Sequence, residues 1–334
     1  MHKPPFAIEL KPYGGALVEL AGRRPDVLCL SGDLTRQTEI DLFQQSFPDR
    51  FIHAGMAEAN MIGMAGALAR EGFQPFVHTF GVFATRRPFD QIVNAIAYPN
   101  LPVRLIGFMP GVSSPGGPSH QAIEDVAIMR ALPNFTVIDV ADAVEIRQVV
   151  PMLPDIDGPV YLRLKRGEIP VIFDEDHHFS LTSAQVLTKG DDVALIASGM
   201  MLAAALEAER VLREAGVGVR VVNVPVIKPI DSATVREAVR VTSVAVTAEN
   251  HSRIGGLGSA VAEIIADSGL PRPLHRIGVD DTFAEGSRTA DFLFEKYGLS
   301  TQAVIDAVWA HSGRTGHAPV ATRRAVAAGE YQPV

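Results

Sequence analysis

Short apolar runs alternate with helical stretches along the first half of the chain. The apolar runs have the length of strands and lie at residues 26–30, 51–55, 74–80, 101–106, 135–140 and 160–164. The predicted helices lie between them, at residues 13–21, from residue 58 onward, at 87–97 and at 143–153. This alternation predicts a parallel sheet with helices on both of its faces.

A second pattern of the same kind follows a boundary segment. Four strand-like runs, at residues 192–199, 219–225, 243–250 and 273–279, are separated by further helical stretches. The segment between the two patterns has several acids and few apolar repeats. We therefore predict an α/β protein with two parallel-sheet domains. The predicted divisions are a first domain at 1–170, a linker at 171–190, a second domain at 191–313 and a tail at 314–334.

Composition restricts the class of partner. The chain has 334 residues, enough for two domains with separate cores, and its formal net charge of −8 leaves no basic surplus to neutralise nucleic-acid phosphates. The single cysteine, Cys29, lies in an apolar run and is predicted to be a buried strand residue. One cysteine allows no disulfide within the chain, and no apolar run has the length of a signal core or a membrane span. We therefore expect a cytoplasmic protein without nucleic-acid or membrane partners.

The segment 51–83 carries the most unusual polar residue. Glu58 lies in the first turn of a predicted helix that follows a turn at Gly55 and ends at Gly72. A helix N-terminus favours a carboxylate, so one interpretation is a solvated acid that stabilises the helix start. The other is a buried acid, kept neutral among small and apolar neighbours so that it can donate or share a proton. The position alone leaves both interpretations open.

Other candidate residues also follow strand ends. Asp33, Glu58, Phe80 and the loop after Phe108 would lie along one edge of the sheet, where parallel sheets bind their ligands. That loop is rich in glycine, proline and serine and ends at His120, which is either a structural histidine or part of an active site.

Two further motifs have weaker interpretations. The pair His177 and His178 does not share a face and has no surrounding ligand set, so a metal site there is not favoured. The glycine cluster 255–258 lacks the residues of a phosphate-binding loop. His251 lies between Glu249 and this cluster.

Three segments resemble the C-terminal half of transketolases. They are GMAEANMIGMAGALAREGFQPFVHTFGVF, GGPSHQAIED and AENHSRIGGLGSAVAE, which occur in the order of that family within residues 6–313. The resemblance implies a pyrimidine-binding domain followed by a transketolase C-terminal domain. The third segment is an interface and folding element in the family, which implies a structural or interface role for His251. It also implies thiamine diphosphate as the cofactor and transfer of a two-carbon ketol unit from a ketose to an aldose.

Matching the motifs residue by residue implies specific roles. Glu58 would exchange a proton with the pyrimidine ring, and Phe80 and Phe83 would wall that ring. His120 would face the substrate carbonyl, so that Glu58 and His120 are the predicted catalytic residues. The predicted cofactor-binding residues are Asp33, Leu34, Glu58, Phe80 and Phe83. The predicted substrate-binding residues are His120, Gln121, Arg166 and Lys11. We assign no metal ligand to this chain.

Four positions depart from the family pattern. Arg86 stands where familiar transketolases have a third aromatic residue, and Gly116 stands where they have an acid. Phe108 and Gln37 lie where they have phosphate-contacting histidine and serine residues. Because polar contacts to the substrate are altered, we hypothesise that the substrate is a modified sugar, or one that carries an anion other than the usual phosphate.

The family's diphosphate site is absent from the sequence. The resemblance implies Mg²⁺ held by a Gly-Asp-Gly segment and a following Asn, and this chain contains no Gly-Asp-Gly. We therefore expect a split enzyme, in which a separate subunit binds the diphosphate and Mg²⁺ in an α2β2 assembly. Gly63 and Gly66 would give the Glu58 helix a smooth face for packing against that subunit.

Three alternatives remain open at this point. Two are enzymes with the same domains: the β subunit of a 2-oxo acid dehydrogenase, and a protein like deoxyxylulose-phosphate synthase. The third is a non-catalytic scaffold subunit that has kept the fold, although a scaffold requires neither Glu58 nor His120.

Overall fold

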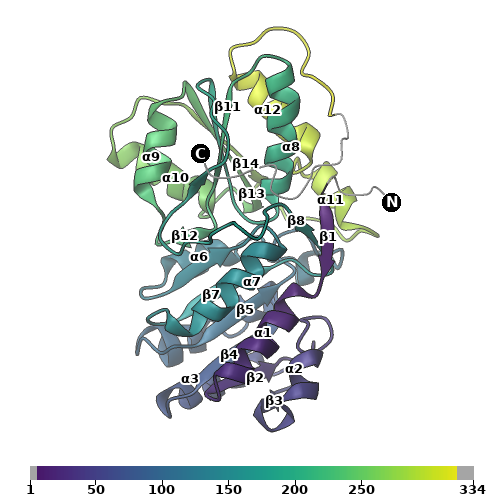
Figure 1. Cartoon of the computed structure of the whole chain (residues 1–334), viewed down its shortest axis with the longest axis vertical. Coiled ribbons are helices and arrows are strands. Elements are labelled where there is room, and N and C mark those ends of the chain that lie inside the picture. The colour runs from purple at the N-terminus through teal and green to yellow at the C-terminus, as the bar shows by residue number, and fades with distance from the viewer. Residues whose placement is uncertain (1–5, 322–334) are drawn as a thin grey trace.

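The computed structural model describes residues 6–321 and contains two α/β domains (Figure 1). The first is built on a seven-stranded sheet with the order β12-β6-β7-β5-β4-β2-β3. Its neighbouring strands are parallel, except that β12 pairs antiparallel with β6. In chain order the strands are β2 (Val27–Ser31), β3 (Phe51–His53), β4 (Gln74–Phe80), β5 (Arg104–Phe108), β6 (Thr136–Asp139), β7 (Val160–Leu164) and β12 (Val226–Lys228).

Helices cover both faces of this sheet. The helices α1 and α7 pack on one face and share an apolar cluster, while α3, η2 and α6 pack on the other. The α-helices are α1 (Pro12–Arg23), α2 (Asp41–Ser46), α3 (Glu58–Arg70), α4 (Gly81–Thr85), α5 (Phe89–Gln91), α6 (Asp125–Ala131) and α7 (Ala143–Met152). The others are the π-helix η2 (Ile92–Ala97) and the 3₁₀ turns η1 (Pro48–Arg50), η3 (Pro118–His120) and η4 (Leu153–Asp155).

The second domain repeats the arrangement around a five-stranded sheet. Its order is β14-β13-β10-β11-β9, and all neighbouring strands are parallel except β9 and β11. The strands are β9 (Gln185–Val186), β10 (Val193–Ala197), β11 (Val219–Asn223), β13 (Val244–Ser252) and β14 (Leu274–Val279). The helices are α8 (Met201–Glu214), α9 (Ser232–Arg240), α10 (Leu257–Asp267), α11 (Ala290–Lys296) and α12 (Thr301–His311).

The predicted fold class is confirmed, and the reason lies in the strands. The central strands β2, β5, β7 and β10 are buried at every position, as expected of parallel strands covered on both faces. Cys29 is fully buried in β2, as predicted. The domain boundaries themselves remain a prediction. The structure adds that β12, from the chain after the linker, completes the edge of the first sheet.

Some local predictions differ from the structure. The predicted helix at 87–97 starts at Phe89 instead, because Pro88 disfavours a helical residue before it, and it consists of α5 followed directly by η2. Phe83 lies in α4, a short helix that the sequence pattern did not reveal, rather than at a strand end. The strands β1 (Ala7–Leu10) and β8 (Glu168–Val171) form a separate antiparallel pair. Short edge strands of this kind carry too little periodicity to be recognised.

Charged side chains are buried where the two domains meet. Arg163 of β7 donates to Asp125 of α6 and to Asp139 of β6, each at 2.9 Å, and to the backbone oxygen of Asn250 at 3.0 Å. The Arg163 side chain is 1% exposed. Because the partners come from both domains, this network fixes the second domain against the first.

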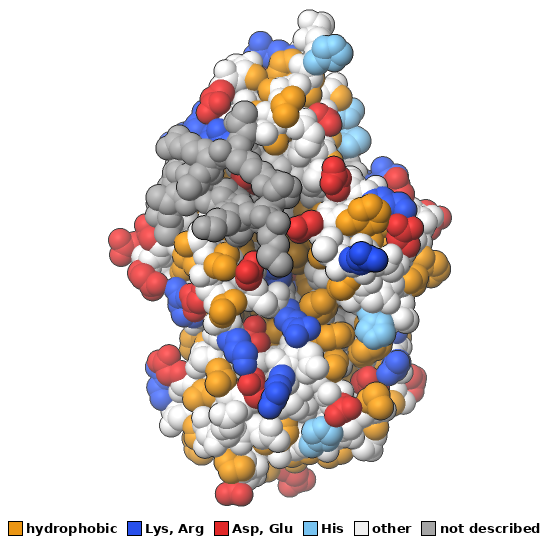
Figure 2. Space-filling view, turned by 90° about the vertical axis from the view of Figure 1, so that its right-hand side faces the viewer, with side chains coloured by type: hydrophobic (Ala, Val, Ile, Leu, Met, Phe, Trp, Pro, Cys, Tyr) orange, Lys and Arg blue, Asp and Glu red, His pale blue; other side chains and the backbone are white. Residues whose placement is uncertain are grey.

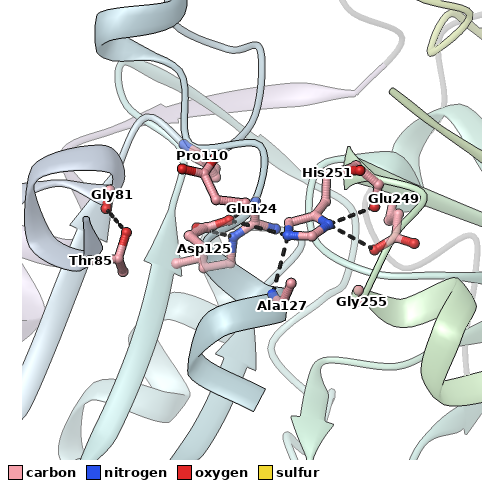
Figure 3. A network of polar contacts seen from close by, with 12 residues as sticks. Gly81, Thr85, Pro110, Glu124, Asp125, Ala127, Glu249, His251 and Gly255 are labelled. Carbon is pink, nitrogen blue, oxygen red and sulfur yellow. Dashed lines mark hydrogen bonds and ion pairs between the residues drawn. The ribbon is translucent and has the colours of Figure 1, made fainter. Parts of the chain in front are cut away.

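His251 extends the same interface (Figure 3). Its Nδ1 lies 2.7 Å from the backbone oxygen of Ser252, which can only accept, so Nδ1 carries the proton. Its Nε2 then accepts the N–H of Ala127 at 3.3 Å, across the interface. The neighbouring Glu249 accepts the N–H groups of Leu257 and Gly258 at the start of α10. These contacts agree with the interface role predicted for His251.

Three remaining features concern the boundary segment and the surface. His177 is buried and stacked on Phe173 at 3.8 Å between ring centroids, and burial lowers its pKa to about 4. Residues 322–334 of the predicted tail lie outside the described residues, and within those described no helix is long and apolar enough to cross a membrane. On the face in Figure 2, basic side chains are interspersed with acidic and hydrophobic ones.

Candidate active site

Glu58 is buried at the first turn of α3. Gly55 adopts a φ of +74°, which glycine tolerates and which turns the chain from β3 into the helix. The Glu58 side chain is 4% exposed, so the solvated-acid interpretation is wrong. A carboxylate enclosed to this extent requires a cation or a hydrogen-bond donor. Nη1 of Arg87 supplies one, at 3.1 Å and 3.3 Å from the two Glu58 oxygens.

Two phenylalanine rings lie near one another where β4 ends and α4 begins. Phe80 is the last residue of the strand, and Phe83 lies one turn into α4. Their ring centroids are 6.1 Å apart with an angle of 17° between the planes. Arg87 connects them to the acid, because its guanidinium carbon lies 4.4 Å from the centroid of Phe83. The carboxyl of Glu58 and the face of Phe83 therefore belong to one site.

His120 joins this site from the loop after β5. Its ring meets Phe83 edge-on, with centroids 5.2 Å apart and 75° between the planes. Its Nδ1 lies 2.9 Å from the hydroxyl oxygen of Ser119. A side chain at Gly116 would place its Cβ 2.9 Å from the Cβ of His120. The family has an acid at the position of Gly116. Here the His120 side chain occupies the space that a side chain at this position would take.

Arg86 secures the loop that carries His120. It forms an ion pair with both oxygens of Glu124, and it donates to the backbone oxygens of Pro118 at 3.0 Å and Gln121 at 2.9 Å. These acceptors lie on both sides of His120 in the sequence. Arg86, which stands where the family has a third aromatic residue, thus holds the loop in place and does not add a third ring beside Phe80 and Phe83.

Gln121 connects the same loop to the second domain. Its amide nitrogen donates to the backbone oxygens of Ser114 at 3.0 Å and Glu285 at 3.1 Å. Ser287 donates its N–H to the backbone oxygen of Pro115 at 2.9 Å. The loop is therefore fastened by both domains. The proposed contact of Gln121 with substrate remains a prediction, and the residue is 1% exposed.

Asp33 and Leu34 follow the end of β2, as predicted. Asp33 has a φ of 70° and pairs with His53 at 3.2 Å, with about half of its side chain exposed. Leu34 is partly buried against the cluster that contains Phe80. Parallel order places β2 beside β4, so these residues and the Phe80 site share one edge of the sheet.

The two predicted substrate cations have different surroundings. The Lys11 ammonium pairs with Asp41 at 2.8 Å. Arg166 lies in a pocket of about 420 Å³ between the domains, together with Met109, Lys165, Met200, Asp291 and Phe294. Burial lowers the pKa of Lys165, whose ammonium donates to the backbone oxygen of Glu168. Phe108, in place of the family's histidine, is fully buried and packs edge-on against Tyr13 at 5.6 Å.

Sequence reasoning missed Arg87 and Lys165 and left Arg86 without a role. The adjacent arginines follow a helix that was not predicted, and their partners lie 29 and 38 residues away in the chain. No local pattern indicates such pairings. Lys165 adjoins the matched Arg166, and that proximity is the one signal that could have suggested it.

Comparison with known proteins identifies the two domains. Residues 11–171 match the model of the transketolase pyrimidine binding domain, and residues 182–304 match that of the transketolase C-terminal domain. The chain belongs to the transketolase family. The family resemblance of the three sequence segments is thereby confirmed.

Members of the transketolase family match nearly the whole chain. A 6-deoxy-6-sulfo-D-fructose transketolase subunit of Clostridium sp. (strain MSTE9) is 40% identical over 91% of this chain and 96% of that protein. A Methanocaldococcus jannaschii protein, named as a transketolase C-terminal section, is 39% identical over 88% of this chain and 93% of its own length. A solved structure, described as a split gene transketolase in an inactive β4 tetramer, superposes with a TM-score of 0.83. Its sequence is 44% identical, and the match covers 90% of this chain and 97% of that one.

Proposed function

We propose that this chain is the C-terminal (β) subunit of a split transketolase that uses thiamine diphosphate. It would transfer a two-carbon ketol unit from a ketose to an aldose, with a second subunit completing the site. The observation that carries the proposal is the convergence of buried Glu58, the Phe80–Phe83 pair and His120 at one sheet edge. The sulfofructose transketolase subunit, 40% identical over nearly its whole length, supports the same reaction class.

The residues present fit the pyrimidine half of the cofactor. An aminopyrimidine ring offers a nitrogen at its edge and an aromatic face, and Glu58 and Phe83 offer a carboxyl group and a ring face within reach of one side chain. Ring stacking adds about 0.5–1.5 kcal/mol beyond burial. Asp33 and Leu34 follow the adjacent strand and are proposed to border the ring. When bound, thiamine diphosphate supplies the carbon nucleophile that cleaves the ketose.

The chain's own residues would divide the remaining work. Glu58, enclosed at the first turn of α3, would hold a proton at the ring nitrogen of the bound cofactor. The His120 imidazole would orient the substrate oxygen at which negative charge develops. Arg86 and Gln121 keep the His120 loop in place and so exclude alternative positions of the imidazole.

The proposed substrate is a ketose with a modified or differently charged end. Phe108 and Gly116 remove two polar side chains that ordinary transketolases have, while Arg166 and Lys165 line a pocket between the domains. Arg166 and Lys11 are the proposed contacts to the anionic end of the sugar. The relative that acts on 6-deoxy-6-sulfo-D-fructose makes a sulfonate the first anion to test.

The proposed partner is a subunit that carries the diphosphate and Mg²⁺ site, in an α2β2 assembly in the cytoplasm. The split-gene relative is described as inactive in a β4 tetramer, which supports the need for a second subunit. In the proposed assembly the Mg²⁺ ligands are on that partner.

The test is a Glu58→Gln variant combined with the proposed diphosphate-binding subunit. Removing a positioned acid costs about 10²- to 10⁴-fold in rate, so ketol transfer should fall by at least two orders of magnitude. Glu71→Gln, an exposed acid just past the end of α3, is the matched control and should retain full activity. Unchanged turnover in Glu58→Gln would instead support a scaffold role, and activity of the unaccompanied chain would refute the split enzyme.

Substrate choice separates the enzyme alternatives. The wild-type assembly should process 6-deoxy-6-sulfofructose or an unphosphorylated ketose faster than xylulose 5-phosphate. Equal or better rates on the sugar phosphate would remove the modified-substrate hypothesis. Release of CO₂ from pyruvate or another 2-oxo acid would favour a dehydrogenase-like or deoxyxylulose-phosphate-synthase-like enzyme.

A further inference from the structure

Arg87 contacts both groups that the proposed function assigns to the pyrimidine ring. One nitrogen of its guanidinium lies 3.1 Å and 3.3 Å from the two oxygens of Glu58. The guanidinium carbon lies over the Phe83 ring, 4.4 Å from its centroid. A single side chain thus engages the acid and the ring face together.

The pairing has a clear electrostatic origin. A carboxylate with 4% of its side chain exposed is unfavourable unless a cation or several donors face it, and Arg87 provides the cation. The negative face of the Phe83 ring attracts the same guanidinium. Both interactions hold Arg87 at one position.

The Arg87 side chain, unlike that of Glu58, is open to solvent. The Arg87 side chain is 55% exposed, so its charge can return to water once another group takes its place at Glu58. Pro88 restricts the backbone of Arg87, so the change would take place in the side-chain torsions. The neighbouring Arg86 differs, since it is held by Glu124 and by two backbone oxygens.

We propose that Arg87 and the cofactor's pyrimidine ring compete for Glu58 and Phe83, an inference that rests on the proposed function. Arg87 lies against both oxygens of Glu58, and a ring nitrogen that shares a proton with Glu58 needs one of the same oxygens. The occupied face of Phe83 cannot also stack on the pyrimidine ring. Arg87 therefore neutralises Glu58 in the free subunit and leaves when the cofactor binds.

The first measurement tests the pair itself in the full chain. Glu58→Gln, Arg87→Gln and the double variant are unfolded in urea without cofactor. We expect the two effects to be coupled by about fivefold in the unfolding equilibrium, because each variant removes one side of the same contact. Additive effects would overturn the inference. Arg70→Gln, at the other end of α3, is the control and should show no coupling with Glu58→Gln.

The second measurement tests the competition. Thiamine diphosphate with Mg²⁺ is titrated calorimetrically into the assembly of this chain with its diphosphate-binding partner. Arg87→Gln should bind the cofactor about tenfold more tightly than wild type, Arg87→Lys should lie between them, and Arg70→Gln should match wild type. Equal or weaker binding in Arg87→Gln would overturn the competition while leaving the proposed function intact. A wild-type assembly that binds no thiamine diphosphate would refute the proposed function, and the competition with it.

Discussion

Two buried acids in the first domain are paired with arginine in different ways. At the domain interface, Asp125 and Arg163 are 0% and 1% exposed, and the guanidinium has further partners in Asp139 and Asn250. At the candidate site, Glu58 is equally enclosed at 4%, but 55% of its partner Arg87 is exposed.

The difference separates a structural pair from an exchangeable one. Removing Arg163 would leave two carboxylates in the interior without their cation, so the interface pair is fixed by the cost of breaking it. Arg87 can withdraw into water, and Glu58 can then take another partner. A buried acid whose arginine remains open to solvent is therefore the better candidate for binding a ligand, although both acids have similar exposure.

The largest expected effect comes from breaking the enclosed pair. Arg163→Met keeps the volume but leaves Asp125 and Asp139 unpaired, which should lower the unfolding free energy by about 3–5 kcal/mol. Urea unfolding of the full chain measures this loss. Arg23→Gln removes an exposed pair with Glu19 and is the matched control, with an expected change below about 0.5 kcal/mol. A loss under 1 kcal/mol in Arg163→Met would show that the enclosed Arg163–Asp125 pair is no more costly to break than a pair that is open to solvent.

A third buried acid sharpens the comparison, because backbone N–H groups rather than an arginine face it. Glu39 is 3% exposed and accepts the N–H of Gly14 at 3.2 Å. Burial raises its pKa from 4.5 to about 7. Between these values the folded chain binds more protons than the unfolded chain, so stability falls as pH rises from about 4.5 to 7. The contribution lost is on the order of 3 kcal/mol.

Glu39→Gln isolates this contribution. The amide resembles the protonated acid and can still accept the Gly14 N–H, so both proteins should have similar stability near pH 5. Near pH 8 the variant should be more stable, because it has no carboxylate to keep buried. Thermal unfolding at both pH values provides the measurement. Burial also raises the pKa of Asp142 and of Glu145, and these affect both proteins equally. A difference that does not change with pH would refute the assignment.

The sequence predicted the strands better than it predicted the contacts. The runs at 74–80 and 160–164 coincide with β4 and β7, because parallel strands buried on both faces are mostly apolar along their length. The short strand β12 was missed, since three residues beside a proline carry no periodicity of their own. Its pairing with β6 depends on how the second domain is placed.

At the candidate site, the motif matches located the groups but not their neighbours. Glu58, Phe80 and His120 were placed at one sheet edge by their positions after strands, and the structure brings them together. Arg87 was not foreseen, because an ion pair between residues far apart in sequence depends on three-dimensional packing. The enclosed pair of Asp125 and Arg163 was missed for the same reason.

The smallest expected effect distinguishes the two sides of helix α3. A Cβ on Gly66 would lie 2.6 Å from the backbone oxygen of Ala95, whereas a Cβ on Gly63 would meet nothing within 4 Å. The expectation that both glycines face the partner is therefore wrong for Gly66, which packs against η2 of its own chain.

Alanine at each position makes the contrast measurable. Gly66→Ala should lower the unfolding free energy of the free chain by about 1–3 kcal/mol through overpacking against Ala95. Gly63→Ala should raise it by roughly 0.5–1 kcal/mol, because alanine favours the helix and the space is open. If the open side of α3 meets the partner subunit, Gly63→Ala should also weaken assembly, measured by titrating one subunit with the other. A Gly63→Ala chain that is more stable and assembles as tightly as wild type would place the partner on a different surface from the one beside Glu58.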